Sequence, residues 1–186
     1  MIERAKEVGA VVIIDEAYHY FYPNTFLGHV RRDGNVIVLR TFSKLFSLAA
    51  VRLGVIISNP ELIHYVRNAR LTFDTNAVAL LFGERILDHP EIRDELIRSE
   101  EEGKAYILSE LNERGYETRD CRGNFIFIRT KRDAGEVAKD LETKKKVLVH
   151  PYSNPLLQPF IRVSVGSRNA MQRFLDAFLE TDGGDK

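Results

Sequence analysis

The chain has 186 residues, 44% of them hydrophobic and 29% charged, a mixture typical of a folded protein with a buried core. Lysine plus arginine and aspartate plus glutamate each number 27, so the net charge is zero, which argues against a nucleic-acid or anionic-membrane partner. The single cysteine, Cys121, excludes an internal disulfide. No apolar run approaches the ~18 residues of a membrane span, and the first residues, MIERAKEVGA, do not resemble a secretory signal, so we expect a cytoplasmic protein.

The first half of the sequence alternates helix-like and strand-like segments. Its apolar runs VVII, VIVL and VII are continuous, which is typical of strands buried on both faces of a sheet. Strands separated by helix-length connections indicate an α/β fold with a largely parallel sheet. In chain order, the expected elements are a helix at 2–8, strands at 11–14, 36–39 and 55–57, and helices at 60–70 and 76–88.

His89-Pro90 marks the best boundary, and it divides the chain into two α/β domains at 1–88 and 89–186. A long amphipathic helix at 91–114 opens the second domain and would join it to the first. The run Lys144-Lys145-Lys146 is expected to be a solvated helix end rather than a phosphate-binding patch. The other expected elements are strands at 116–119, 125–129, 147–149 and 161–165, helices at 134–142 and from Arg168, and a frayed tail, TDGGDK.

Polar groups follow two of the predicted strands at the points where the strands end. In an open α/β sheet, ligands bind beyond the carboxyl ends of parallel strands, so these groups would share one edge. Together they offer a carboxylate, a phenol, two hydroxyls and an amine, and an arginine follows eight residues after the amine. The residues are Asp15 and Tyr18 after the first strand, Thr41, Ser43 and Lys44 after the second, and then Arg52.

This set of groups suits pyridoxal 5'-phosphate. That cofactor needs a lysine to bond it covalently and an acid to pair with its ring nitrogen. It also needs donors for its phosphate, namely hydroxyls and preferably an arginine, whose planar fork matches phosphate oxygens. All of these residue types are present between Asp15 and Arg52.

Four segments of the sequence also resemble those of a known family. The first two, DEAY at 15–18 and TFSKLFSLAAVRLG at 41–54, resemble the cofactor site of fold-type I, class I/II aminotransferases. The others, GNFIFIR at 123–129 and IRVSVGSRNAMQRFLDAFLE at 161–180, resemble the C-terminal lobe of the histidinol-phosphate aminotransferase branch. The resemblance therefore extends over nearly the whole chain.

The resemblance implies a role for each residue of the cofactor site. Lys44 would bond the cofactor and then move a proton between the substrate's α-carbon and the cofactor. Asp15 would pair with the pyridinium nitrogen, and Tyr18 would donate to the phenolic oxygen of the ring. The phosphate would be held by Thr41, Ser43 and Arg52.

The second lobe would supply the substrate contacts. By the resemblance, Arg162 would clamp the α-carboxylate of the substrate with two parallel hydrogen bonds, which positions the α-carbon. Asn124 would face the substrate or serve only in a turn. The implied reaction exchanges an amino group between an amino acid and a 2-oxo acid, with glutamate and 2-oxoglutarate as the second pair, in a homodimer. The amino-acid substrate is not readable, and decarboxylases of the same fold share counterparts of Asp15, Lys44 and Arg52, so the reaction type stays open.

Members of this family are longer and contain upstream a glycine-rich phosphate loop, an aromatic residue stacked on the cofactor and an asparagine on its phenolic oxygen, which have no counterpart here. We therefore expect the C-terminal half of an aminotransferase: part of the large cofactor-binding domain and the smaller C-terminal domain. Without the missing strands, the strands at 11–14 and 36–39 would expose faces and edges that are otherwise buried. The isolated chain is expected to bind cofactor weakly, to aggregate or dimerise, and to have little or no transaminase activity.

Alternative interpretations remain. VVIIDEA also resembles the Mg²⁺-binding strand of an ATPase-like nucleotide-binding domain, although the G-x-x-x-x-G-K-[ST] loop for the phosphates is missing. The chain could also be a non-catalytic fragment or interaction module of the aminotransferase fold. Thr41 and Ser43 could cap a following helix, and Arg52 could pair with a core carboxylate. The five histidines show no metal-ligand spacing, so no metal is expected.

Overall fold

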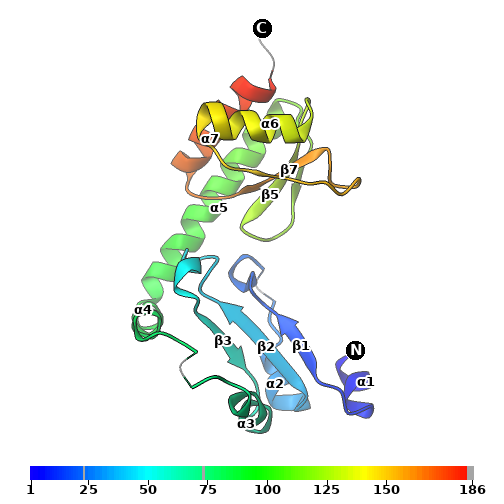
Figure 1. The fold of residues 1–186 in the computed structure, drawn as a ribbon, viewed down its shortest axis with the longest axis vertical. Helices are drawn as coiled ribbons and strands as arrows, with labels where there is room; N and C mark the ends of the chain where they lie inside the picture. Colours follow the sequence, from blue (N-terminus) through cyan, green and yellow to red (C-terminus); the bar gives the residue numbers. More distant parts are fainter. Residues whose placement is uncertain (23, 73, 184–186) are drawn as a thin grey trace. The chain divides into compact units, whose positions relative to one another are not determined.

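The computed structural model describes residues 1–22, 24–72 and 74–183 (Figure 1). It divides into two units, unit 1 (Met1–Asp94) and unit 2 (Glu95–Lys186). The helix α5 (Pro90–Glu113), predicted at 91–114 as the helix that joins the two domains, contains the division. A domain boundary at residues 88 and 89 stays a prediction. Within the described ranges, no helix is long and apolar enough to cross a membrane.

Unit 1 is built on a three-stranded sheet in the order β1-β2-β3. Strands β1 (Val12–Asp15) and β2 (Val36–Thr41) are parallel, with Asp15 opposite Leu39. Strand β3 (Gly54–Ile57) pairs with β2 in the antiparallel direction, so the parallel arrangement expected from the apolar runs applies to β1 and β2 only. Since β1 and β2 run the same way, their carboxyl ends lie at one edge of the sheet.

Ahead of α5, the described residues of unit 1 form four helices. They are α1 (Ile2–Glu7), α2 (Leu27–Asp33), α3 (Pro60–Asn68) and α4 (Ala77–Asp88), with short 3₁₀ turns η1 (His19–Phe21) and η2 (Ala49–Val51). Of these helices, only α2 connects two strands of the sheet, while α1 precedes β1 and α3 and α4 follow β3 (Figure 1). Helix α2 was not predicted, because its segment LGHVRRD has only two large apolar residues. A core cluster of the unit joins Ile2 and Val30 from these helices to Val36 and Val38 of β2.

The two parallel strands differ in burial. Val36 and Val38 of the central strand β2 are fully buried, because they pack against Ile2 of α1 and Val30 of α2. Ile13 of β1 is 62% exposed, and Val11 just before β1 is 46% exposed. The prediction that 11–14 is buried on both faces is therefore wrong, and the expected exposure of the two apolar runs holds for 11–14 but not for 36–39.

Unit 2 contains a four-stranded antiparallel sheet in the order β4-β5-β7-β6. One face packs against α5 and α7 through Ile126, Ile161, Ile107 and Phe178, all fully buried. The elements after α5 are β4 (Thr118–Asp120), β5 (Phe125–Arg129), α6 (Ala134–Asp140), the π-helical turn η3 (Leu141–Lys145), β6 (His150–Pro151), β7 (Phe160–Ser164) and α7 (Arg168–Asp182).

Three sequence predictions about unit 2 need correction. The predicted strand at 116–119 lies at Thr118–Asp120. The strand predicted at 147–149 is displaced to His150–Pro151, because the Val147 N–H donates to the Leu141 carbonyl (3.0 Å) and thereby belongs to the turn that ends η3.

The tail TDGGDK is not frayed at its start. Helix α7 continues through Asp182, whose side chain is buried and accepts hydrogen bonds from the Lys131 and Arg132 N–H groups at 2.9 Å each. A short polar sequence at a chain end gives no sign of such partners 50 residues away. Residues 184–186 lie outside the described residues.

Candidate active site

The loop after β2 brings Lys44 against the phenol ring of Tyr18. The Lys44 Nζ lies 5.4 Å from the ring centre, within the range of a cation–π contact. Lys44 belongs to a turn in which the Ser47 N–H donates to the Lys44 carbonyl at 3.1 Å, and Ser47 adopts a left-handed φ of 55°. Lys44 and Tyr18 are both half-buried. The structure thus joins two of the residues that the sequence predicted at one sheet edge.

Asp15 ends β1 at the same edge. Its Oδ1 accepts a hydrogen bond from the Ala17 N–H at 2.9 Å, which orients the carboxylate in the turn between β1 and Tyr18. The side chain is exposed, and within the described residues it forms no ion pair. A carboxylate held by one backbone bond and left without a cation retains the capacity to pair with a positively charged group of a ligand.

Thr41 and Ser43 form a turn rather than a helix cap. The Ser43 N–H donates to the Thr41 Oγ1 at 3.0 Å. The 3₁₀ turn η2 starts at Ala49, with Leu48 as its N-cap residue, so the helix that Thr41 or Ser43 could have capped does not begin there. The Thr41 hydroxyl also lies 3.5 Å from the Leu53 carbonyl, to which it donates, and a phosphate-binding role for Thr41 and Ser43 stays a prediction.

Arg52 has a strained backbone and a guanidinium without an acidic partner. Its φ of 58° lies in the left-handed region, which costs energy for a residue other than glycine. Its Nη1 donates to the Ala49 carbonyl at 2.8 Å. Across the described parts of the chain it forms no ion pair, so the alternative of a core carboxylate partner finds no support. The arrangement leaves donors of Arg52 available for an anion.

Directly behind this edge lies a buried ion pair that was not predicted from the sequence. The Glu16 side chain is 5% exposed, and its Oε2 accepts from the Nε and Nη2 of Arg40 at 3.1 and 2.9 Å. The pair depends on register, since parallel pairing of β1 with β2 places Glu16 level with Arg40, and the sequence pattern does not specify that register.

Unit 2 contains the two predicted substrate residues. Arg162 lies in β7 opposite Phe127 of β5, and its guanidinium carbon is 4.8 Å from the ring centre of Phe125. Among the described residues, Arg162 has no carboxylate partner. A half-buried guanidinium stacked on an aromatic ring and free of acids is suited to bind a carboxylate. The carboxylate clamp itself stays a prediction.

Asn124 serves in the backbone of the sheet. Its carbonyl accepts from the Val165 N–H at 2.8 Å, extending the β5–β7 ladder by one bond. This bond tests neither role of the side chain, so both the turn role and the contact with a substrate stay predictions. Arg168 begins α7, where the sequence predicted a helix start, and its guanidinium carbon lies 5.0 Å from the ring centre of Tyr106.

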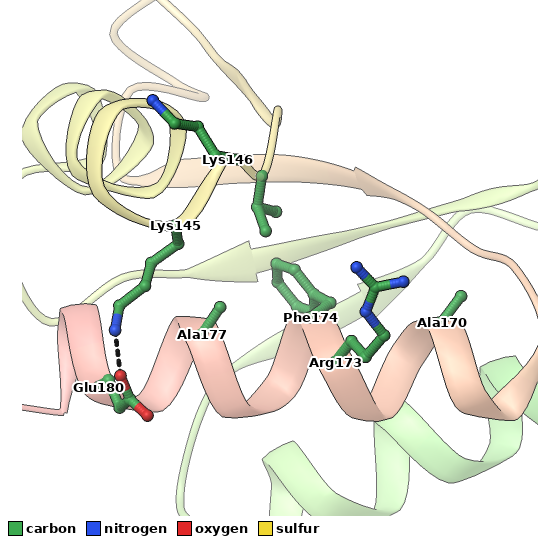
Figure 2. Close-up of a pocket in the computed structure, with 8 residues that line it drawn as sticks. Lys145, Lys146, Ala170, Arg173, Phe174, Ala177 and Glu180 are labelled. Carbon is green, nitrogen blue, oxygen red and sulfur yellow. Dashed lines mark hydrogen bonds and ion pairs between the residues drawn. The ribbon is translucent and has the colours of Figure 1, made fainter.

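A surface cavity in unit 2 is lined by residues that do not belong to the candidate active site. Its volume is about 430 Å³. It lies between η3 and α7 (Figure 2). Lys145 contacts the Glu180 carboxylate across it, and the Lys146 ammonium points away from Phe174 and donates to the Thr143 carbonyl at 3.1 Å. These lysines are exposed at the end of η3, in agreement with the predicted solvated helix end. Over the described ranges, no group of three or more His, Cys, Asp or Glu residues has metal-binding geometry.

Comparison with known proteins extends this picture. A family model described as aminotransferase class I and II matches residues 1–178. The histidinol-phosphate aminotransferase of Thermotoga maritima is 34% identical over 167 residues, which cover 90% of this chain and 48% of that protein. The chain thus spans about half the length of the curated relatives it matches.

Solved structures show the same fold. Histidinol-phosphate aminotransferase from Sinorhizobium meliloti, solved in complex with pyridoxal-5'-phosphate, has a TM-score of 0.83 at 21% identity and covers 93% of this chain and 49% of its own. A decarboxylase from Sulfurospirillum multivorans has a TM-score of 0.84 at 17% identity, covering 100% of this chain and 50% of its own. These similarities confirm the predicted α/β fold.

Proposed function

Since the chain belongs to the aminotransferase class I and II family, we propose that it acts in the transfer of an amino group between an amino acid and a 2-oxo acid, with pyridoxal 5'-phosphate as cofactor. The observation that carries the proposal is the half-buried Lys44 ammonium, 5.4 Å from the Tyr18 ring centre, at the sheet edge where Asp15 ends β1. Curated relatives named histidinol-phosphate aminotransferase support a substrate of that class.

The chemistry of the donor set fits this cofactor. A lysine amine, an acid without a cation and an arginine without an acid stand beyond one edge of the sheet, in Lys44, Asp15 and Arg52. Each has a counterpart on the cofactor: an aldehyde for the amine, a ring nitrogen for the acid and a phosphate for the arginine. The cofactor, when bound, supplies an electron-withdrawing ring that stabilises negative charge at the substrate's α-carbon.

Each candidate residue of unit 1 would bind a different part of the cofactor. Lys44 Nζ would bond the cofactor and, as a free amine, take and return the α-proton of the substrate. Tyr18, already in contact with Lys44, would donate its hydroxyl to the cofactor's phenolic oxygen. Asp15, oriented by the Ala17 N–H, would hold the ring nitrogen protonated. Thr41, Ser43 and Arg52 would hold the phosphate.

The residues of unit 2 would bind the substrate. Arg162 would accept the α-carboxylate on its guanidinium fork, while Phe125 beneath it restricts the orientation of the fork. Asn124 would contribute at the start of β5. We also propose a homodimer as the working form, from the family resemblance, and a cytoplasmic location, with which a single exposed cysteine agrees.

Of two other candidate functions, the structure argues against one and is compatible with the other. For a Mg²⁺-binding ATPase, Glu16 would have to be available to the metal, but it is buried and paired with Arg40 at 2.9 Å. A decarboxylase would use the same cofactor residues, and the similar fold of the decarboxylase from Sulfurospirillum multivorans keeps that reaction as the second candidate. Assay of both product classes, released CO₂ and new 2-oxo acid, separates the two.

The proposal is tested by covalent trapping. The purified chain is mixed with pyridoxal 5'-phosphate, reduced with borohydride and mapped by peptide mass spectrometry. We expect label on Lys44 and its loss in Lys44→Ala, while Lys6→Ala, a variant at an exposed lysine of the same unit, keeps the label at Lys44. Label spread evenly over surface lysines, or retained at equal yield in Lys44→Ala, would refute cofactor binding at this site.

A further inference from the structure

A closed set of hydrogen bonds surrounds Glu16. Its Oε2 accepts from Arg40 Nε at 3.1 Å and Nη2 at 2.9 Å, and its Oε1 accepts from the Phe26 N–H at 2.6 Å. The Thr25 hydroxyl lies 3.0 Å from both carboxylate oxygens and itself receives a bond from Arg40 Nη2 at 2.9 Å. Both oxygens of a nearly inaccessible carboxylate therefore have partners, from two segments of unit 1, β2 and the loop before α2.

Burial makes these bonds necessary. A carboxylate removed from water without partners would lose several kcal/mol of solvation. The buried Glu16 can therefore stay charged only while its hydrogen bonds are present. Burial alone would raise the pKa of Glu16, but hydrogen bonds from Phe26, Arg40 and Thr25, with the positive charge of Arg40, hold the pKa below its usual range. Burial and the charge of Arg40 lower the pKa of His19, whose Nδ1 is 3.9 Å from Glu16, so the imidazole adds no second cation at neutral pH.

Register places this pair on the side of the sheet opposite to Asp15. Asp15 faces Leu39 across the parallel ladder, and the Glu16 N–H continues the ladder to the Leu39 carbonyl at 2.9 Å. Successive side chains of a strand alternate between faces, so Glu16 shares a face with Arg40 while Asp15 shares the other face with Leu39. The ion pair thus lies behind the sheet edge that carries the candidate catalytic groups, one residue from Asp15 and four from Lys44.

We propose that Glu16 and Arg40 are positioning residues, whose ion pair holds the Asp15–Tyr18 turn at a fixed height against the segment that carries Lys44. The backbone ladder between β1 and β2 ends at Leu39. After this point, the side chain of Arg40 connects β2 to the turn through its hydrogen bonds to Glu16. The Phe26 and Thr25 bonds add the loop before α2 to the same anchor. The effect of the ion pair on cofactor binding at Lys44 rests on the proposed function. Its role in holding the Asp15–Tyr18 turn does not depend on that function.

The test removes both charges together, because either single truncation would leave an uncompensated buried charge and could unfold the unit. The variant is the double substitution Glu16→Gln with Arg40→Met, compared with Arg40→Lys and with Arg70→Met. Arg40→Lys keeps a cation without the planar fork. Arg70→Met deletes an exposed arginine that pairs with Asp74 in the same unit, and serves as the matched control.

The first measurement is hydrogen exchange of the Ala17 amide, which donates to Asp15 Oδ1 in the turn. In the double variant we expect exchange at Ala17 to rise at least about tenfold while the buried β2 amides of Val36 and Val38 keep their rates. Arg40→Lys should fall between the double variant and the unchanged chain, and Arg70→Met should have no effect. Unchanged exchange at Ala17, or an equal rise throughout β2, overturns a positioning role.

The second measurement is the cofactor concentration that half-labels Lys44 in the trapping experiment. We expect it to rise about tenfold in the double variant, in parallel with exchange at Ala17. Faster exchange with unchanged labelling overturns the link to Lys44. If the unmodified chain does not label Lys44 at all, the proposed function fails, and the exchange measurement alone decides whether the ion pair holds the turn.

Discussion

The two units of the chain differ in how completely they bury their own apolar side chains. Unit 2 encloses its core between one face of the antiparallel sheet and helices α5 and α7. Among the exposed large apolar side chains of the described residues, only Leu148 and Leu156 belong to unit 2, and the rest belong to unit 1. Exposed apolar surface on this scale marks contact with other protein. We infer that unit 2 can stabilise itself, whereas unit 1 depends on a partner surface.

The largest expected effect is on the core of unit 2. Phe178 is fully buried and packs on Phe174 and Tyr116 at ring-centre distances of 5.5 and 5.1 Å. Phe178→Ala should destabilise the unit by about 3–5 kcal/mol, through lost burial and a cavity. Amide exchange of β5 and β7 against urea concentration measures this change in the unit itself.

A matched substitution in unit 1 serves as the contrast. Ile13 is 62% exposed, so Ile13→Ala should change stability by less than about 0.5 kcal/mol. Equal losses in Phe178→Ala and Ile13→Ala would remove the difference between a closed and an open unit.

The next effect concerns association through unit 1. The purified chain should self-associate through apolar side chains such as Ile13, which lies on the edge strand β1. Ile13→Lys should raise the dissociation constant about tenfold or more, since burying one large apolar side chain contributes about 1.5–3 kcal/mol and an edge lysine opposes strand pairing. Sedimentation velocity over a concentration series gives the constant.

The control for association lies in unit 2. Leu156 is 84% exposed and belongs to unit 2, which is not expected to take part in association, so Leu156→Lys should leave the dissociation constant unchanged. Self-association through the exposed apolar surface of unit 1 would be contradicted by a chain that stays monomeric at all concentrations. It would also be contradicted by equal responses to the two lysine substitutions.

Much of the fold could be predicted from local patterns. The apolar runs located β2 and β3 to within a few residues, and the amphipathic period located α5, because in both cases the pattern repeats over the whole element. Helix α2 escaped prediction because its stability comes from packing Val30 on β2 rather than from its own sequence. Gly103 shows the same limit: it lies in the middle of α5, where glycine is unfavourable, because the backbone of Gly166 leaves no room for a side chain.

The candidate site divides in a similar way. Asp15 and Lys44 could be placed at one edge because both directly follow strands that run in parallel. The Glu16–Arg40 pair could not, because it depends on which residues of β1 and β2 lie level, and a shift by one residue would turn both side chains to the other face. The left-handed backbone of Arg52 has no sequence signal at all, since arginine rarely adopts it.

The smallest expected effect is a pH dependence that belongs to α5 in unit 2. Burial raises the pKa of Glu100 to about 7, partly opposed by the positive charge of Lys104, and its Oε2 has no hydrogen-bond partner among the described residues. A carboxyl with a raised pKa in the folded state is held protonated there, so stability is greatest below about pH 4.5, where both states are protonated, and falls as pH rises to about 7. Because the side chain is only partly buried, the loss should be about 1–2 kcal/mol rather than the full equivalent of the pKa change.

Glu100→Gln should flatten the pH profile of unfolding between pH 4.5 and 7, while Glu101→Gln, at the exposed neighbouring position, should leave it as it is. A profile that is already flat in the unmodified chain would mean that Glu100 reaches water, and that the core of unit 2 is less closed than its buried side chains indicate.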